Sequence, residues 1–126
     1  DFGIFDELAC FYARGRVLDV GAGAGCISRF LQGMELEVTA IEISPDAVEV
    51  MRKLGVKDAR VGDFFDLKGE QWDTILLLMN GIGFVGNLDG LDRFLAHCKL
   101  LLKPGGQILF DSSDLAEADL DGTDYT

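Results

Sequence analysis

The sequence has little positive charge. Eleven Lys and Arg residues stand against twenty-two Asp and Glu residues, so the 126-residue chain carries a formal net charge of −11. Only Arg52 and Lys53 form a basic cluster, and the other basic residues are scattered. A surface with this excess of negative charge repels a phosphate backbone. We therefore expect no nucleic-acid partner.

Long apolar runs and paired cysteines are also missing. The longest apolar run covers residues 75–79, whereas a membrane helix needs about 20 residues, so we expect no membrane partner. Cys10, Cys26 and Cys98 stand far apart and are odd in number, which argues against a disulfide framework and a thiolate metal site. We predict no metal and a cytoplasmic location. The chain begins at Asp1 without an apolar leader, which suggests a trimmed N-terminus or a fragment.

The apolar residues that are present alternate between strand and helix patterns. We predict strands over 16–20, 36–41, 57–61, 74–79 and 107–111. Helices are predicted over about 5–13, from just after Gly25 to about Gly33, over 45–54 and over about 88–102. This rhythm predicts an α/β fold, a Rossmann-like three-layer sandwich with a mostly parallel sheet in the order 3-2-1-4-5. Ligands of such sheets bind at the carboxyl ends of the strands.

Three glycines follow the first strand. Gly21, Gly23 and Gly25 form a GxGxG pattern, whereas a dinucleotide fingerprint needs glycine at position 26, where Cys26 stands. The GxGxG spacing still lets the backbone approach a ligand and aims the next helix N-terminus at an anion. The competing interpretation is a tight turn that binds no ligand.

Acidic residues follow the next two strands. Glu42 is placed to accept hydrogen bonds from a ribose diol, and Asp63 to accept one from the amine of adenine. Phe64 or Ile43 would cover the base. Glu42 as a solvated acid and Asp63 as a helix cap are the alternatives.

Taken together, these features resemble the class I S-adenosylmethionine-dependent methyltransferases. The stretch VLDVGAGAG over 17–25 is similar to the first motif of that family, and LKPGG over 102–106 to its turn before strand five. The resemblance covers about residues 16–111. It implies that S-adenosyl-L-methionine is the cofactor and that the following residues bind it: Asp19, Gly21, Ala22, Gly23 and Gly25 at the methionine end, Glu42 at the ribose, Asp63, Phe64 and Ile43 at the adenine, and Asn80 at the methionine amine.

The resemblance also implies methyl transfer by in-line displacement, which depends mainly on positioning. Asp111 and Asp114 are weak candidates for a base, and a helix cap or a surface loop is an equally good account of either. The stretch NGIG over 80–83 differs from the Asn-Pro-Pro-aromatic motif of family members that methylate base amines. A small molecule is therefore the expected acceptor, with a protein next.

Family members usually continue with two strands after the fifth, and both are missing from this sequence. We expect one domain over 1–126, with an N-terminal helix in 1–15, a cofactor-binding core over 16–111 and an acidic tail over 112–126. The chain is expected to be a C-terminally truncated fragment, or a minimal form whose strand-five edge is covered by a second copy or another partner. A non-catalytic binding or scaffold module is the main alternative function. A nicotinamide-dependent oxidoreductase is disfavoured by Cys26 and Asp63.

Three other residues receive structural interpretations. His97 lies away from the apolar stripe of its predicted helix, so we expect a solvated surface residue. Trp72 is expected to pack in the core, and Cys26 to be a small packing residue beside the cofactor.

Overall fold

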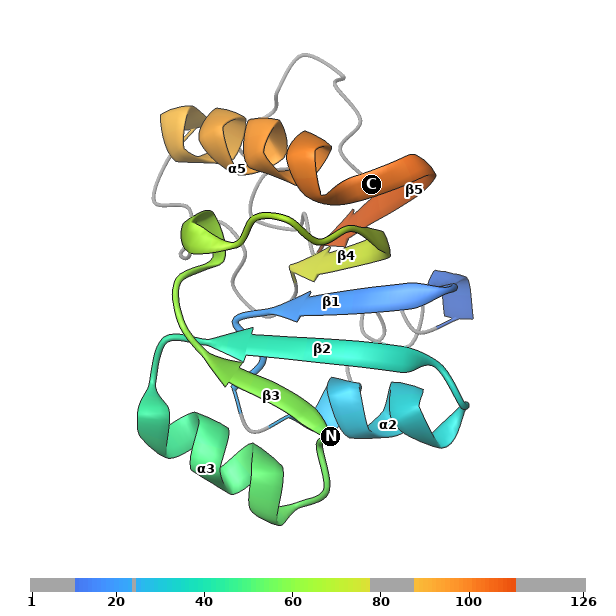
Figure 1. The fold of residues 1–126 in the computed structure, drawn as a ribbon, viewed down its shortest axis with the longest axis vertical. Coiled ribbons are helices and arrows are strands. Elements are labelled where there is room, and N and C mark those ends of the chain that lie inside the picture. The colour runs from blue at the N-terminus through green and yellow to red at the C-terminus, as the bar shows by residue number, and fades with distance from the viewer. Residues whose placement is uncertain (1–10, 24, 78–87, 111–126) are drawn as a thin grey trace.

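The protein has an open parallel sheet, seen here in a computed structural model that describes residues 11–23, 25–77 and 88–110. Strands in this part of the chain run in the order β3-β2-β1-β4-β5, as the sequence predicts, and every neighbouring pair is parallel (Figure 1). Their bounds are Arg16–Val20 for β1, Glu37–Glu42 for β2, Asp58–Val61 for β3, Trp72–Leu77 for β4 and Leu102–Phe110 for β5.

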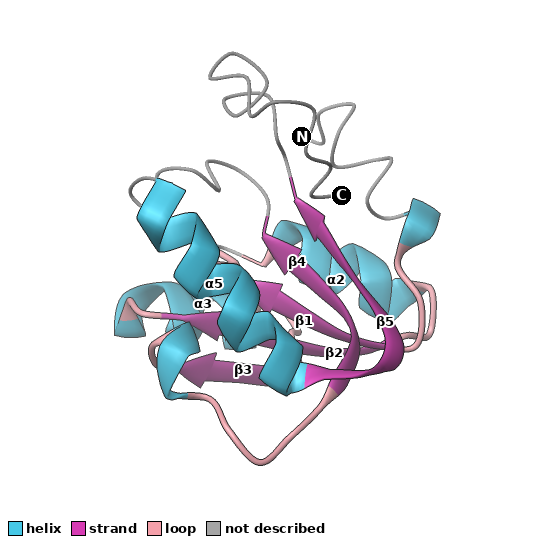
Figure 2. Ribbon diagram, turned by 90° about the horizontal axis from the view of Figure 1, so that it is seen from above, coloured by secondary structure: helices cyan, strands magenta, loops and turns pink. Residues whose placement is uncertain are grey.

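Helices cover both faces of this sheet. Helices α2 (Cys26–Gly33) and α3 (Pro45–Lys53) pack on one face, and α5 (Leu88–Leu101) packs on the other (Figure 2). Alternation along each strand produces the two layers: Val17 of β1 contacts the α2 side, whereas Leu18 belongs to the cluster under α5. A three-residue 3₁₀ turn, η1 (Phe64–Asp66), follows β3. No helix within the described ranges is long and apolar enough to cross a bilayer.

Local sequence signals set the bounds of α3. The Ser44 hydroxyl accepts a hydrogen bond from the Ala47 N–H at 3.2 Å, and Pro45 occupies the first turn, where its missing N–H has no cost. Glu49 and Lys53 form the expected i,i+4 pair at 3.7 Å. The apolar pattern of the sequence predicts buried positions for Phe30 on α2 and Leu54 at the end of α3, and both predictions are wrong: Phe30 is 48% exposed and Leu54 is 45% exposed. Apolar character alone therefore does not bury a helical residue.

The predicted turn over 102–106 forms part of β5. Leu102 pairs with Trp72, and the ladder resumes only at Thr74 with Gln107, so residues 103–106 loop out opposite a single residue of β4. Gly105 supplies the positive φ of 80° that this excursion requires, and its carbonyl accepts a hydrogen bond from Arg14 Nη2 at 2.8 Å. The strand therefore begins five residues earlier than the sequence predicts, because Leu102 already pairs with Trp72 before the turn.

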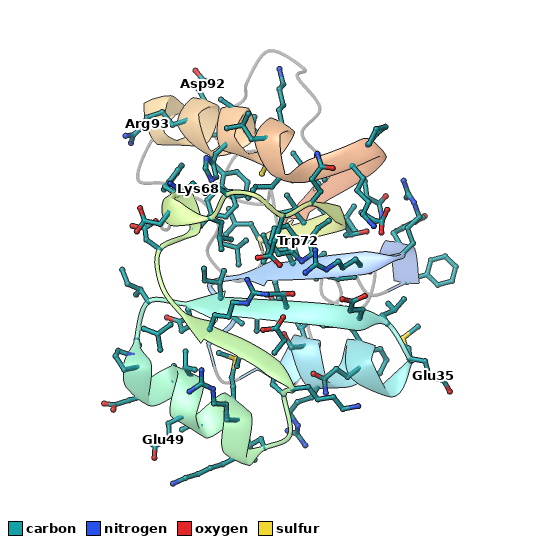
Figure 3. All side chains as sticks on the ribbon, viewed as in Figure 1. Glu35, Glu49, Lys68, Trp72, Asp92 and Arg93 are labelled. Carbon is teal, nitrogen blue, oxygen red and sulfur yellow. The ribbon has the colours of Figure 1, made fainter. Side chains whose placement is uncertain are left out.

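A charged network covers the face of β3 opposite α3. Ala59 packs under α3, so Asp58 and Arg60 project from the other face. Glu70 accepts hydrogen bonds from Arg60 Nη1 at 2.6 Å and from Arg16 Nη2 at 2.8 Å, and Arg60 also binds Asp58 at 2.9 Å. The Trp72 indole, fully buried as expected, donates to the Thr39 hydroxyl at 3.2 Å (Figure 3). Ion pairs and one indole thus lie on the same face of the sheet as α5 and extend its cover towards β2 and β3.

This network predicts an acid-dependent contribution to stability from Glu70. The hydrogen bonds from Arg60 and Arg16 lower the pKa of the Glu70 carboxyl from 4.5 to about 2. A lowered pKa in the folded state means that this stabilisation is complete above about pH 5 and is lost as the pH falls from 4.5 towards 2. We expect Glu70→Gln to lower the free energy of unfolding at pH 7 by about 1 kcal/mol or less, since partly exposed pairs are screened.

The measurement is urea unfolding of both proteins at a series of pH values. The difference between them should shrink as the pH falls and vanish near pH 2. Asp92→Asn on the exposed side of α5 is the matched control and should shift stability little at any pH (Figure 3). A Glu70→Gln difference that stays constant with pH would contradict the ionic account.

Candidate functional site

A cavity opens at the carboxyl ends of β1, β2 and β3. Its volume is about 300 Å³. The lining residues all come from the strand ends or the segments that follow them: Val20, Gly21, Ile41, Glu42, Ile43, Gly62, Asp63, Phe64 and Phe65. Five residues that the sequence predicts as site residues, namely Gly21, Glu42, Ile43, Asp63 and Phe64, therefore meet in one space.

The glycine loop after β1 is bound to the end of β2. Gly21 and Gly23 have φ values of 66° and 62°, in the left-handed region that glycine tolerates best. The N–H groups of Gly21 and Ala22 both donate to the Ile41 carbonyl, at 2.9 and 3.3 Å. A methyl group added at Gly21 or Gly23 would meet no described atom within 4 Å, so the backbone has open space beside it.

The third glycine of the loop has a packing role. Gly25 is buried, with a φ of 83°, and a Cβ there would lie 2.7 Å from Met51 Cγ and 2.9 Å from Val56 Cγ2. Ala22 packs against the same cluster under α3. Neither residue lines the cavity. Gly25 lets the start of α2 lie close to α3, and it shapes the loop from behind.

Asp19 is buried on the α2 side of β1. Its side chain is 3% exposed and accepts a hydrogen bond from the Ser28 hydroxyl at 2.6 Å. Because Asp19 lies two residues before the loop and Ser28 lies in the first turn of α2, this bond connects the two ends of the glycine loop. Asp19 does not line the cavity.

Glu42 joins the end of β2 to the loop through both carboxylate oxygens. Oε1 accepts from the Gly23 N–H at 2.8 Å, and Oε2 accepts from the Ser44 N–H at 3.3 Å. Each carboxylate oxygen can accept a second hydrogen bond, so Glu42 can organise the loop and still accept bonds from a ligand in the cavity.

Asp63 holds the η1 turn on the other side of the cavity. Its Oδ1 accepts from the Phe65 N–H at 2.8 Å, and its side chain is exposed. The cap that the sequence offers as an alternative is therefore present, while Oδ2 remains available to accept in addition.

The Phe64 ring is 2% exposed and lies in the core, whereas Phe65, which sequence reasoning missed, is 40% exposed at the cavity. Two adjacent phenylalanines after a strand are consistent with one buried and one exposed ring. The sequence alone does not indicate which of the two is buried.

The expectation for His97 is wrong. This residue is half-buried, its Nε2 lies 3.0 Å from the Leu67 carbonyl oxygen, and its ring contacts both Phe64 and Phe65. The loop after η1 folds over α5 at this point, which a helical wheel cannot indicate. Cys26 is exposed and is thus not the packing residue we expect; Gly25 takes the buried position beside it.

Acidic groups dominate the electrostatics of the cavity. Glu42 and Asp63 are the charged side chains among its described lining residues. Such a site favours a ligand that carries positive charge and hydroxyl or amine donors. No cluster of three His, Cys, Asp or Glu side chains with metal-binding geometry occurs in the part of the chain that the structure describes. Asn80, Asp111 and Asp114 lie outside the described residues.

Comparisons with known proteins agree with this geometry. Residues 18–110 match the model of the methyltransferase domain family. The chain is 34% identical over 107 residues to a ubiquinone biosynthesis O-methyltransferase of Xanthomonas oryzae pv. oryzae (strain PXO99A), covering 79% of this chain and 44% of that protein. A similar protein from Xylella fastidiosa (strain 9a5c) is 33% identical over 101 residues, covering 74% of this chain and 39% of that one.

A solved methyltransferase structure is also similar to this chain. An S-adenosylmethionine-dependent methyltransferase from Bacteroides fragilis, crystallised with S-adenosyl-L-homocysteine, is 46% identical with a TM-score of 0.81, covering 86% of this chain and 46% of that one. The chain spans less than half the length of these relatives. With the family model matched over most of the sequence and the sheet order in agreement, the chain belongs to the class I S-adenosylmethionine-dependent methyltransferase family.

Proposed function

We propose that this protein binds S-adenosyl-L-methionine in the cavity at the ends of β1, β2 and β3 and transfers its methyl group to a small-molecule acceptor. The observation that carries the proposal is the convergence of the open glycine loop, Glu42 and Asp63 on one acidic cavity. The names of the O-methyltransferase relatives support an oxygen acceptor, and a cytoplasmic location belongs to the same proposal.

The residues present fit this cofactor. Glu42 would accept from the ribose hydroxyls, and Asp63 with the backbone of Phe64 would bind the adenine edge. Ile43 is 70% exposed and Phe65 40% exposed, both at the cavity, so apolar side chains are offered to the faces of a base. The open side of Gly21 and Gly23 would receive the rest of the cofactor, with Asp19, Ala22 and Gly25 shaping the loop from behind. We include Asn80 in the proposed site from the sequence alone.

The cofactor, when bound, supplies a methyl group on a sulfonium, which is already an activated electrophile. The protein then has to hold the reacting groups in line and keep them apart from water. A base is needed only where the acceptor must lose a proton. Asp111 and Asp114 remain the sequence-based candidates for that role.

Isothermal titration of the chain with S-adenosyl-L-methionine, S-adenosyl-L-homocysteine and NAD tests the proposal. We expect binding of the first two and no heat from NAD, because the loop lacks the third fingerprint glycine and Asp63 is placed for adenine. Turnover is then measured as release of S-adenosyl-L-homocysteine with a panel of small hydroxylated acceptors. NAD binding alone, or silence of all three ligands, would contradict the proposal.

A non-catalytic binding module is the second candidate. Binding of the cofactor without product release from any acceptor would favour this alternative.

A further inference from the structure

We propose that His97 is a positioning residue that fixes the aromatic wall of the cavity and thereby sets the affinity for the adenine end of the cofactor. The inference rests on the proposed function. It assigns a role to a residue of α5, a helix whose described side chains are not among the residues that line the cavity.

A hydrogen bond connects α5 to the end of η1. His97 Nε2 lies 3.0 Å from the Leu67 carbonyl oxygen. A carbonyl oxygen can only accept, so Nε2 carries the proton and donates. Leu67 is the C-cap of η1, and the carbonyls at a helix end have no partner within the helix. His97 thus supplies a side-chain partner at the point where η1 ends.

The ring of His97 packs against two phenylalanine rings. Its centroid lies 4.9 Å from that of Phe64, with the two planes at 75°, and 5.6 Å from that of Phe65. Phe64 and Phe65 are themselves 5.1 Å apart in an edge-to-face arrangement. Such contacts stabilise a fixed orientation of each ring. His97 therefore contacts one buried ring and one cavity-facing ring at the same time.

The η1 turn is too short to be stable without contacts to neighbouring residues. It has three residues, and a single 3₁₀ turn has little stability of its own. Asp63 holds its N-terminal end through the Phe65 N–H, and His97 holds its C-terminal end through Leu67. Without His97, Phe65 would have more orientations to lose when a base packs on it, so binding would weaken.

Two substitutions separate the hydrogen bond from the ring. His97→Gln keeps an N–H donor and loses the ring, whereas His97→Phe keeps a ring and loses the donor. We expect each to weaken S-adenosyl-L-homocysteine binding about twofold to fivefold, and His97→Ala about fivefold to twentyfold. Asp92→Ala is the control, because Asp92 is exposed and points away from the sheet on the same helix, and it should bind as the unmodified chain does (Figure 3).

A double-mutant cycle with Phe65 distinguishes positioning from general destabilisation. If His97 acts through Phe65, adding His97→Ala to Phe65→Ala should weaken binding by less than twofold further. Isothermal titration at a temperature where thermal unfolding shows each variant fully folded supplies the dissociation constants. Adenosine as a second probe should show the same pattern, because it carries only the end of the cofactor that Phe65 would contact.

The outcomes are distinct. The role of His97 is supported if His97→Ala weakens binding of both S-adenosyl-L-homocysteine and adenosine, and if this loss largely disappears when Phe65 is already alanine. Wild-type affinity in His97→Ala, or losses that multiply independently with Phe65→Ala, would overturn it while leaving the proposed function intact. If the unmodified chain fails to bind S-adenosyl-L-homocysteine, the proposed function falls and this inference falls with it.

Discussion

Replacement of Glu42 with alanine is expected to weaken binding of S-adenosyl-L-homocysteine about tenfold to a hundredfold. The variant would lose the proposed hydrogen bonds to the ribose, and we expect their loss to cost about 1.5–3 kcal/mol in total, the scale of a hydrogen bond to a charged group. It would also free the Gly23 N–H, which now donates to Glu42 at 2.8 Å, so the loop would lose part of its fixed conformation. Isothermal titration measures the change.

Two further variants make this result interpretable. Glu49→Ala removes the same charge from the outward side of α3 (Figure 3), and it should leave the affinity unchanged. Glu42→Gln keeps an oxygen acceptor without the charge, so its affinity for S-adenosyl-L-homocysteine should lie between those of the wild type and Glu42→Ala. An affinity of Glu42→Ala equal to that of the wild type would remove Glu42 from the proposed site.

Gly25→Ala is expected to lower the free energy of unfolding by about 2–5 kcal/mol. A non-glycine residue in the left-handed region costs roughly 1–2 kcal/mol, and the added Cβ would press on Met51 and Val56 at 2.7 and 2.9 Å. Urea unfolding should show a lower midpoint with an unchanged slope.

Gly33→Ala is the matched control for this substitution. Gly33 is the last residue of α2, and a Cβ there would meet nothing within 4 Å, so stability should stay the same or rise slightly. A Gly25→Ala protein as stable as the wild type would mean that the contact with α3 is loose enough to accept a methyl group, and the packing role of this glycine would have to be abandoned.

The architecture and half of the proposed site were predictable because they depend on short-range signals. Apolar runs with glycine or proline between them mark strands and helices, and right-handed crossovers leave few sheet orders. Since the carboxyl ends of parallel strands share one edge of the sheet, the amino-acid sequence alone is enough to place Gly21, Glu42 and Asp63 together.

The parts of the fold and of the proposed site that the sequence did not predict depend on contacts between distant segments. Phe65 and His97 lie 32 positions apart in the sequence, and only the path of the chain after η1 brings their rings together. The same holds for the Glu70 network, in which Arg16 comes from β1 and Arg60 from β3. Phe30 and Leu54 show the converse, because each is apolar and nevertheless about half exposed to water.

The loop-out in β5 has a consequence for the register of the sheet. Within a paired strand, an insertion of one residue sends every later side chain to the wrong face of the sheet. Residues 103–106 leave the ladder and rejoin it at Gln107, so a change of length there can be absorbed before the pairing of Ile75 with Ile108. This segment lies at the amino ends of the strands, opposite the cavity. The register of the strand ends that line the cavity is therefore set by the pairs from Gln107 onward and not by the path of residues 103–106.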